Sequence, residues 1–330
     1  MEYMGLFHKY KVNRLLTDKE RERQLDPKVK LEVQPIHQLT VLRMNSTYLE
    51  TVDKYDAWRG WVTIMLLGCM GAFLYLVAGI IGLFSNPSAE QLEFNKLYQL
   101  DLIIIICVAL LAVASIFYWL FLKEAFTWCY YPIRFNRKTR KVHVTRLNGT
   151  VLTVGWDEVF FTLSTTGMGS LGASHWEIQG HVLGEDRETV KETFALALWD
   201  MGHQAHLKQY WEYIRCYMEE GPEALLKTGG GRHDQYLPVL FQRETWWFAA
   251  RRFLFNWHGY SLIPLLAFPL FIATVLGRQI ALRSSRLPKW PAEVEAECVI
   301  EPGDPYERDA RHNKHDLWGM KVWPSQKPLW

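Results

Sequence analysis

Cysteine is scarce in this sequence, and its placement excludes two kinds of stabilising site. None of the five cysteines forms a Cys-x-x-Cys pair, and the first two lie inside long apolar blocks. They are Cys69, Cys107, Cys129, Cys216 and Cys298. Disulfide frameworks and structural zinc sites need cysteines at short spacing, so we expect neither. The free thiols favour a domain that faces a reducing compartment.

The sequence also lacks an excess of charge and the short motifs of common enzymes. Its formal net charge is +2, whereas nucleic-acid binding normally needs a strongly basic face or tail. No nucleophile elbow, zinc-protease, phosphate-loop or dinucleotide motif occurs. The triple glycine at 229–231 has no Lys-Ser or Lys-Thr after it, which is typical of a flexible linker. We therefore expect no enzyme, no cofactor, no metal site and no nucleic acid.

Two long blocks have no charged residue at all, 61–84 and 102–122. A helix needs roughly 20 apolar residues to cross a bilayer core about 30 Å thick, and each block is long enough. The sequence therefore predicts a transmembrane helical hairpin over residues 58–123. With no charge inside the blocks there is no evident ion or substrate path, so a transporter is not favoured.

The charges around the two blocks predict their orientation. The connection at 85–101 is acidic and has a single lysine, while both outer flanks are rich in lysine and arginine. The flanking cations include Lys54, Arg59, Lys123 and Arg134. By the positive-inside rule the acidic connection lies outside and both flanks are cytoplasmic.

A third apolar block, 253–277, allows two interpretations. Pro264 and Pro269 lie in its middle and arginines flank both of its ends, which favours a kinked re-entrant segment with both ends cytoplasmic. The block is also long enough to span, and transmembrane helices tolerate proline. The side of the membrane on which the C-terminal tail lies stays open.

Between the second and third blocks the pattern changes to short strands. Runs rich in β-branched and aromatic residues occur at 133–135, 142–147, 151–154, 159–163, 176–183 and 189–196. Asn148-Gly149 is a dipeptide favoured in tight hairpin turns. Apolar residues then recur at helical spacing over 207–218, and Gly221-Pro222 supplies a stop. We predict an antiparallel β-rich domain closed by one amphipathic helix.

This plan resembles a pleckstrin-homology-like domain. The resemblance lies in 131–137, in Lys141-Val142-His143-Val144, and in Trp156-Asp157-Glu158-Val159. Together with the tail segments 290–296 and 304–306, these motifs are similar to an uncharacterised family of proteobacterial inner-membrane proteins encoded near type VI secretion genes. The resemblance covers roughly 58–310 and implies a multi-pass protein of the bacterial inner membrane with a cytoplasmic main domain. It implies no activity for named residues.

The strongest local cluster of charge lies on the turn that follows the first strand of this domain. It consists of Arg137, Lys138, Arg140 and Lys141, which we name the basic turn. In pleckstrin-homology-like folds the first hairpin turn can bind lipid headgroups, and cations near an anionic leaflet contribute about 1 kcal/mol each. The alternative is that these charges only follow the positive-inside rule.

Other polar pairs predict no site on their own. His203 and His206, like His312 and His315, have spacing suited to a shared metal, but no further ligand is identified, and solvated surface histidines explain them. Asp157-Glu158 are adjacent, and in a strand adjacent side chains point to opposite faces. We therefore interpret them as a polar stretch beside a buried tryptophan at position 156.

Two classes of function remain. The first is a non-catalytic interaction protein of the inner membrane, an accessory or immunity-type factor whose partner is a secreted effector or a secretion component. The second is a sensor of anionic lipid that uses the basic turn. The bilayer is a partner in both, and a homo-oligomer is compatible with both. The predicted segments are 1–57, the hairpin 58–123, the β-rich domain 124–228, a linker 229–252, the third apolar segment 253–286 and the tail 287–330.

Overall fold

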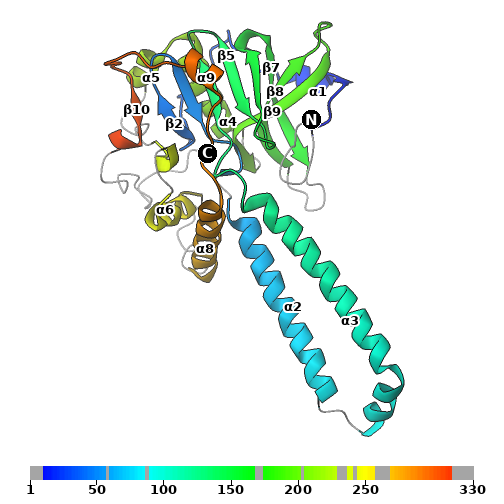
Figure 1. The fold of residues 1–330 in the computed structure, drawn as a ribbon. Helices are drawn as coiled ribbons and strands as arrows, with labels where there is room; N and C mark the ends of the chain where they lie inside the picture. Colours follow the sequence, from blue (N-terminus) through cyan, green and yellow to red (C-terminus); the bar gives the residue numbers. More distant parts are fainter. Residues whose placement is uncertain are drawn as a thin grey trace.

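Two antiparallel β-sheets form the body of the protein, and long helices extend from it (Figure 1). The structure is a computed structural model that describes residues 10–56, 59–85, 89–167, 174–201, 204–228, 236–240, 244–256 and 268–313. The predicted α+β class with antiparallel sheets is confirmed. Each predicted strand of the 133–196 region has a counterpart in one of the two sheets.

The larger sheet has six strands drawn from three distant parts of the chain. In spatial order they are β10 (Arg308–Asp309), β2 (Val41–Met44), β3 (Tyr48–Thr51), β4 (Ile133–Asn136), β5 (Lys141–Thr145) and β6 (Val151–Gly155). The pairing of β3 with β4 brings the N-terminal segment against the β-rich domain, across the two long helices that separate them in sequence. The sheet is therefore complete only when N-terminal, central and C-terminal residues are all present.

The second sheet has four strands. In spatial order they are β1 (Arg14–Leu15), β9 (Thr189–Met201), β8 (Ser174–Leu183) and β7 (Val159–Gly167), and the short helix α1 (Asp18–Glu22) lies beside β7. One turn of 3-10 helix, η2 (Trp156–Glu158), leads the chain from β6 in the first sheet to β7 in the second. The strands predicted as parts of one β-rich domain therefore lie in two separate sheets.

Helix α4 (Ala205–Glu219) packs against the second sheet and the core that both sheets share. Its buried Trp211 stacks on Trp156, with ring centroids 5.7 Å apart, and Phe161 of β7 lies 4.8 Å from Trp211. The helix ends where Gly221 adopts a φ of +93°, the left-handed conformation that glycine tolerates best. The predicted closing helix and its glycine stop are thus confirmed, and α5 (Pro222–Thr228) follows.

Four further helices lie below the sheets in Figure 1. They are α2 (Trp61–Ser85), α3 (Ala89–Glu124), α6 (Trp246–Asn256) and α8 (Phe268–Ser284). Helix α2 contacts both α3 and α8, and α8 also contacts α6. Helix α6 begins inside the region predicted as a linker, and α3 begins inside the predicted acidic connection, so both regions are partly helical.

One stretch of the described chain, Trp61–Gly79 in α2, is long and apolar enough to cross a membrane. Only 11% of that stretch is buried within the protein. In α3 the corresponding apolar stretch among the described residues is shorter and runs over Cys107–Trp119. Length and composition therefore single out one candidate span, where the sequence predicted two.

The C-terminal tail returns to the larger sheet. After α8 the chain forms α9 (Ala292–Glu297), and β10 then pairs with β2. The indole N–H of Trp290 donates to Glu50 Oε1 at 2.9 Å, and the Arg134 guanidinium lies 4.7 Å from the Trp290 ring. Arg252, just before the third apolar segment, donates to the carbonyl oxygen of Leu39, and the carbonyl oxygen of Arg286 at the end of that segment accepts from the backbone N–H of Cys129. Both ends of the segment therefore lie next to the sheets.

His143 of β5 is buried beneath this tail and gives the fold a specific response to pH. Burial lowers its pKa from 6.5 to about 4, although Glu297 acts in the opposite direction. A depressed pKa means that the folded protein favours neutral histidine. The contribution is fully present above pH 6.5 and is lost as the pH falls toward the folded pKa.

We expect the free energy of unfolding to fall by up to about 1.4 kcal/mol per pH unit between pH 6.5 and 4 on account of this one group. Urea unfolding at several pH values measures the slope. His143→Gln removes the titrating group and is expected to flatten the curve above pH 5. An unchanged slope in that variant would assign the pH response to other groups.

Candidate functional site

The basic turn connects β4 to β5, and three of its four cations bind carboxylates. Arg140 contacts Asp157 at 2.6 Å and Glu219 at 2.9 Å. Lys141 contacts Glu297 at 2.7 Å, and Lys138 pairs with Glu301. The side chain of Arg137 lies over Gly221. The turn therefore carries little positive charge that is not already neutralised.

The basic turn also lies at the end of the sheet remote from the long helices. The backbone N–H of Arg137 donates to the carbonyl of Thr47, in the turn between β2 and β3. At the opposite end of the same strand pair, Asp53 accepts a hydrogen bond from Tyr131 N at 2.7 Å. The chain enters α2 from that opposite end. Nothing in this geometry brings the basic turn toward the apolar helices.

The other sequence candidates do not converge. Asp157 is engaged by Arg140, so it is not a partner for Glu158 in acid–base chemistry. His203 and His315 lie outside the described residues, so neither histidine pair is compared with its prediction. Within the described ranges no group of three or more His, Cys, Asp or Glu could hold a metal ion.

The structure instead concentrates buried charge where the four apolar helices meet the sheets. Glu124, the last residue of α3, accepts from the backbone N–H groups of Gly60 (2.6 Å) and Thr63 (2.7 Å). It thus satisfies amide groups at the start of α2 and complements the helix dipole. Arg59 donates to the carbonyl oxygen of Trp128 at 2.8 Å. The start of α2 and the end of α3 are held together.

Beside this contact lies a buried cluster of two cations and two carboxylates, Asp56, Glu244, Arg252 and Arg278, which we name the charged junction. Arg278 of α8 donates to both carboxylate oxygens of Glu244, at 2.8 and 2.7 Å, and to Asp56 at 3.3 Å. Arg252 of α6 donates to the other Asp56 oxygen at 3.0 Å. All four side chains are 5% exposed or less. The cluster is neutral overall and links α6, α8 and the N-terminal segment.

Asp56 is charged at neutral pH despite its burial. Burial raises the pKa of its carboxyl, but Arg278 and then Arg252 outweigh this effect and hold the pKa below its ordinary value. An ionised carboxylate accepts from both arginines, and the arginines are permanently charged. The charged junction therefore stays ion-paired throughout the neutral range.

Two glycines let α8 approach the start of α2 next to the charged junction. A Cβ on Gly277 would lie 2.5 Å from the carbonyl oxygen of Gly60, and a Cβ on Gly60 would lie 2.2 Å from the backbone nitrogen of Arg278. Gly60 also has a φ of +99°. The obstructing atoms belong to backbone, so no side chain can move aside to make room.

We expect Gly277→Ala to lower the free energy of unfolding by about 1–3 kcal/mol, because the added methyl group overpacks this crossing. Urea unfolding in detergent micelles measures the change. Gly71→Ala is the matched control, since nothing lies within 4 Å of a Cβ placed there. That control gains helix propensity and should be neutral or slightly stabilising. Equal losses in the two variants would contradict the close crossing.

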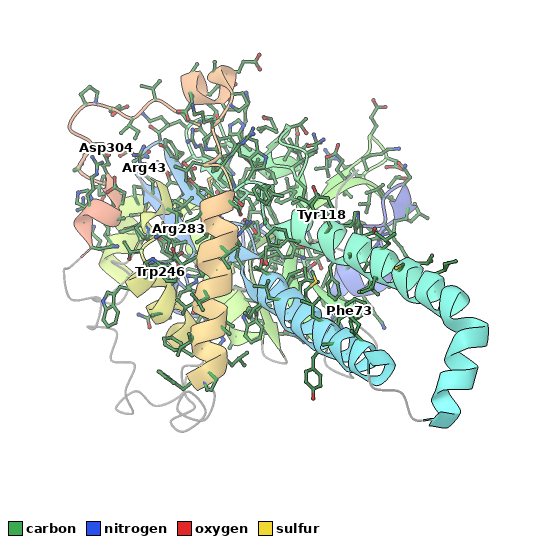
Figure 2. All side chains as sticks on the ribbon, turned by 60° about the horizontal axis from the view of Figure 1, so that its bottom comes forward. Arg43, Phe73, Tyr118, Trp246, Arg283 and Asp304 are labelled. Carbon is green, nitrogen blue, oxygen red and sulfur yellow. The ribbon has the colours of Figure 1, made fainter. Side chains whose placement is uncertain are left out.

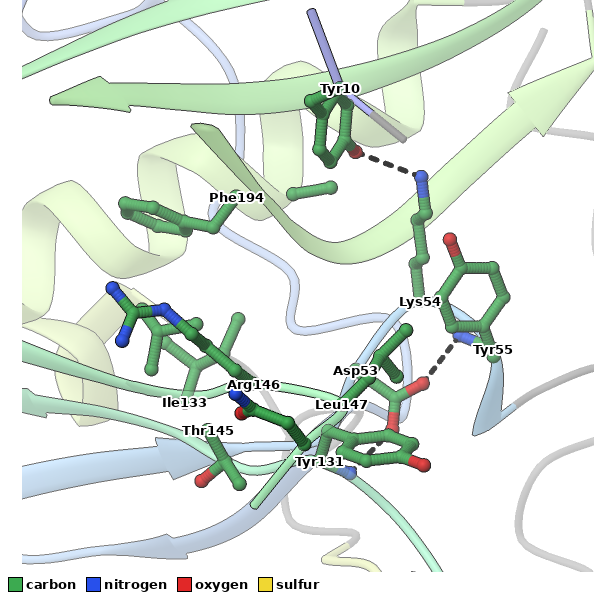
Figure 3. A pocket seen from close by; sticks show the side chains of 13 residues that line it. Tyr10, Asp53, Lys54, Tyr55, Tyr131, Ile133, Thr145, Arg146, Leu147 and Phe194 are labelled. Carbon is green, nitrogen blue, oxygen red and sulfur yellow. Dashed lines mark hydrogen bonds between the residues drawn. The ribbon is translucent and has the colours of Figure 1, made fainter. Parts of the chain in front are cut away.

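A small cavity of about 80 Å³ lies between the two sheets, with Lys54 at its wall (Figure 3). The Lys54 ammonium donates to Glu177 at 2.5 Å and to the Tyr10 hydroxyl at 3.0 Å. The Tyr10 hydroxyl in turn donates to the other oxygen of Glu177 at 2.9 Å. The volume is that of a few water molecules. Because Lys54 already has partners and the cavity is small, we interpret this region as a polar contact between the two sheets.

The sequence analysis used some residues of the charged junction and of the neighbouring contact between α2 and α3, but assigned them another role. Arg59 and Arg252 were interpreted as flanking charges that report orientation, whereas the structure buries them. The signal that could have revealed the junction was the presence of acidic residues at the same boundaries. Asp56 precedes the first apolar block and Glu124 follows the second.

Comparison with known proteins gives one match. The model of a family of unknown function (DUF6708) matches residues 108–302, which is more than half of the chain. The matched region begins within α3 and extends beyond α9, so it includes Glu124, Glu244, Arg252 and Arg278. No curated protein and no solved structure gives a significant match.

Proposed function

The chain belongs to a family of unknown function (DUF6708), and from that premise we propose that it is a non-catalytic interaction protein anchored in the bacterial inner membrane. In this proposal α2 and α3 form the membrane hairpin, and the two sheets are the cytoplasmic module that binds another protein. The family supplies no activity, so the support comes from the residues of this chain.

The observation that carries the proposal is the exposed apolar surface of α2. Met65, Leu74 and Leu76 are each more than half exposed, and Tyr75 is 80% exposed. Soluble monomers rarely expose continuous apolar patches larger than a few hundred Å². A helix of this length with apolar residues on every side is stable in contact with lipid.

Helix α3 supports the hairpin. Its described apolar side chains are exposed in the same way, including Ile105, Leu111 and Ile116. Figure 2 shows α2 and α3 running out from the body together, with Phe73 and Tyr118 labelled on them. Two such helices, tied by Glu124 at their common end, would place the sheets directly at the membrane surface.

The sheets and α4 support a binding module. A helix packed against two antiparallel sheets is compatible with the pleckstrin-homology-like plan that we propose for this domain, a plan that commonly serves binding. The resemblance to proteins encoded near type VI secretion genes favours an accessory or immunity-type role, with a secreted effector or secretion component as partner. We do not propose the second class of function, a lipid sensor that uses the basic turn, because the cations of this turn are largely neutralised by carboxylates.

Membrane anchoring is tested by extracting membranes from expressing cells with alkaline carbonate. The wild-type protein is expected to stay in the pellet. Leu76→Arg places a charge in the apolar part of α2 at a cost of about 2.5–3.5 kcal/mol and should increase the extracted fraction. Val29→Arg, at an exposed position on the sheet side, is the control and should stay in the pellet.

The interaction is tested by purifying the tagged protein from membranes of its native host and identifying proteins that co-purify. A stoichiometric secretion component or effector supports the proposed partner class. Recovery of the protein alone, from crosslinked and uncrosslinked membranes alike, would contradict the interaction function. Complete extraction of wild-type protein by carbonate would contradict the anchor.

A further inference from the structure

We propose that the exposed face shared by α6 and α8 binds the phosphate group of a membrane phospholipid, with Arg283 stacked on Trp246 as the headgroup contact. This inference rests on the proposed membrane anchoring and adds a lipid site to it. The site lies at the end of the domain that carries the apolar helices, remote from the basic turn.

A groove lined by Glu244, Thr245, Trp246 and Arg283 forms the core of this site. The Arg283 guanidinium lies 5.3 Å from the centre of the Trp246 ring, and its Nε donates to the side-chain oxygen of Gln279 at 3.2 Å. The ion pairs that the described residues form at the charged junction join Arg252 and Arg278 to Asp56 and Glu244, and none of them includes Arg283. Glu244 lies in the same groove, but Arg278 occupies both of its carboxylate oxygens.

As far as the described residues show, the groove therefore presents a guanidinium without a carboxylate partner, placed over an aromatic ring. A guanidinium has donors in a fixed fork that matches phosphate oxygens, and stacking on an aromatic face leaves that fork available. This chemistry selects a phosphate in preference to a neutral headgroup. Figure 2 shows Arg283 on α8 and Trp246 beside that helix.

The length of the exposed apolar face of α8 indicates that the phosphate belongs to a membrane lipid. The exposed apolar side chains of this helix are Phe268, Leu270, Ile272, Leu276 and Ile280. From the first to the last of these the helix rises about 18 Å, close to the roughly 15 Å of one leaflet. Arg283 follows within one further turn. If the apolar face lies in the leaflet, Arg283 reaches the level of the phosphates.

Two exposed aromatic residues lie near the groove in sequence or by contact. Trp247 on α6 is 55% exposed, and Phe126, just after α3, is 64% exposed. The backbone N–H of Phe126 lies 3.4 Å from the hydroxyl of Ser284, which places it at the end of α8. Aromatic side chains concentrate at headgroup depth in membrane proteins. The two aromatic residues and the arginine are thus consistent with one interface.

Continuity with α2 argues for lipid over a protein partner on this face. Helix α8 packs on the start of α2 through Gly277 and Gly60, so the exposed faces of the two helices belong to one surface. If α2 lies in the bilayer, the outward face of α8 meets the same lipids. A water-soluble protein could not cover α8 without entering that layer.

The test uses the full chain reconstituted into phosphatidylcholine vesicles that contain a minority of phosphatidylglycerol. One probe is phosphatidylglycerol with a photoreactive diazirine on its headgroup, and the other is phosphatidylcholine with the diazirine at the end of an acyl chain. Crosslinked peptides are then mapped by mass spectrometry. We expect the headgroup probe to label the peptides that contain Trp246 and Arg283, and the acyl-chain probe to label α2.

Arg283→Gln is expected to lower headgroup labelling about fivefold, the change expected for one arginine at an anionic surface. Arg283→Lys should retain part of the labelling, because it keeps the charge and loses the fork. Arg21→Gln, a half-exposed arginine of α1 on the sheet side, is the control and should leave labelling unchanged. Equal urea unfolding curves for the three variants exclude a general loss of structure.

Each of the other possible results would contradict one part of the proposal. Headgroup labelling that is the same in Arg283→Gln and wild type would overturn the arginine contact. Labelling of α2 by the acyl-chain probe without headgroup labelling at Trp246 would overturn the lipid site and leave the anchor intact. Failure of the acyl-chain probe to label α2 would overturn the anchor itself. Loss of headgroup labelling in excess inorganic phosphate, at matched ionic strength, would replace the lipid by a soluble phosphate.

Discussion

Arg278→Met is expected to lower the free energy of unfolding by about 3–5 kcal/mol, because it leaves two buried carboxylates without their shared cation. Arg278 makes two hydrogen bonds to Glu244 and two to Asp56, one of them to the backbone carbonyl oxygen, and all three side chains are buried. Replacement by an apolar side chain of similar length keeps most of the packing. Urea unfolding in detergent micelles, followed by tryptophan fluorescence, measures the loss.

A double-mutant cycle separates the lost charge pair from lost packing. Adding Glu244→Gln to Arg278→Met removes one of the stranded carboxylates and should recover part of the stability. Lys227→Met breaks an exposed pair with Glu223 and is the surface control, with little expected change. If the double variant is as unstable as the sum of the two single variants, the ion pair contributes no coupling and the junction is not the link we describe.

Trp156→Ala is expected to lower the free energy of unfolding by about 3–5 kcal/mol, through lost burial and the cavity that remains. Trp156 is fully buried at the passage between the two sheets. It stacks on Trp211 and lies 4.9 Å from Phe161, ring centre to ring centre. Removing it therefore loosens both sheets and α4 together. Urea unfolding of the full chain measures the effect.

Two further variants show which part of the side chain matters. Trp156→Phe keeps an aromatic ring but removes the indole N–H, which donates to Glu219 at 2.7 Å. It should cost less than the alanine variant because part of the burial is retained. Leu15→Ala, at a position 62% exposed, controls for truncation and should change stability little. An alanine variant at position 156 as stable as that control would contradict the central place of Trp156.

Local elements of this fold were largely predictable. The alternation at 142–147 and 176–183 predicted strands that the structure forms as β5 and β8, and the helical spacing at 207–218 predicted α4. These patterns depend on neighbours within one element, and each element buries the face that its own pattern marks. The pairing of β3 with β4, and of β10 with β2, has no such signal, because the partners are far apart in sequence.

The basic turn shows what a cluster of charges in a sequence leaves undecided. Four cations within five residues allowed either a lipid contact or charges that only follow the positive-inside rule. In the structure Lys138, Arg140 and Lys141 bind carboxylates from η2, α4 and the C-terminal tail. Sequence spacing shows where charges are concentrated along the chain. It does not show which opposite charges the fold brings to them.

The sequence by itself determined where the chain is apolar, which segments of the 133–196 region form strands, and where α4 ends, because hydrophobic periodicity and turn chemistry act over a few residues. Only the tertiary structure decided how the buried charges pair. Asp56 and Arg278 are separated by 222 positions, and their contact exists only once α8 crosses the start of α2 at Gly60. A buried charge is stable only beside its partner. Folding therefore buries the arginines that flank the apolar blocks in ion pairs that connect the helices to the sheets.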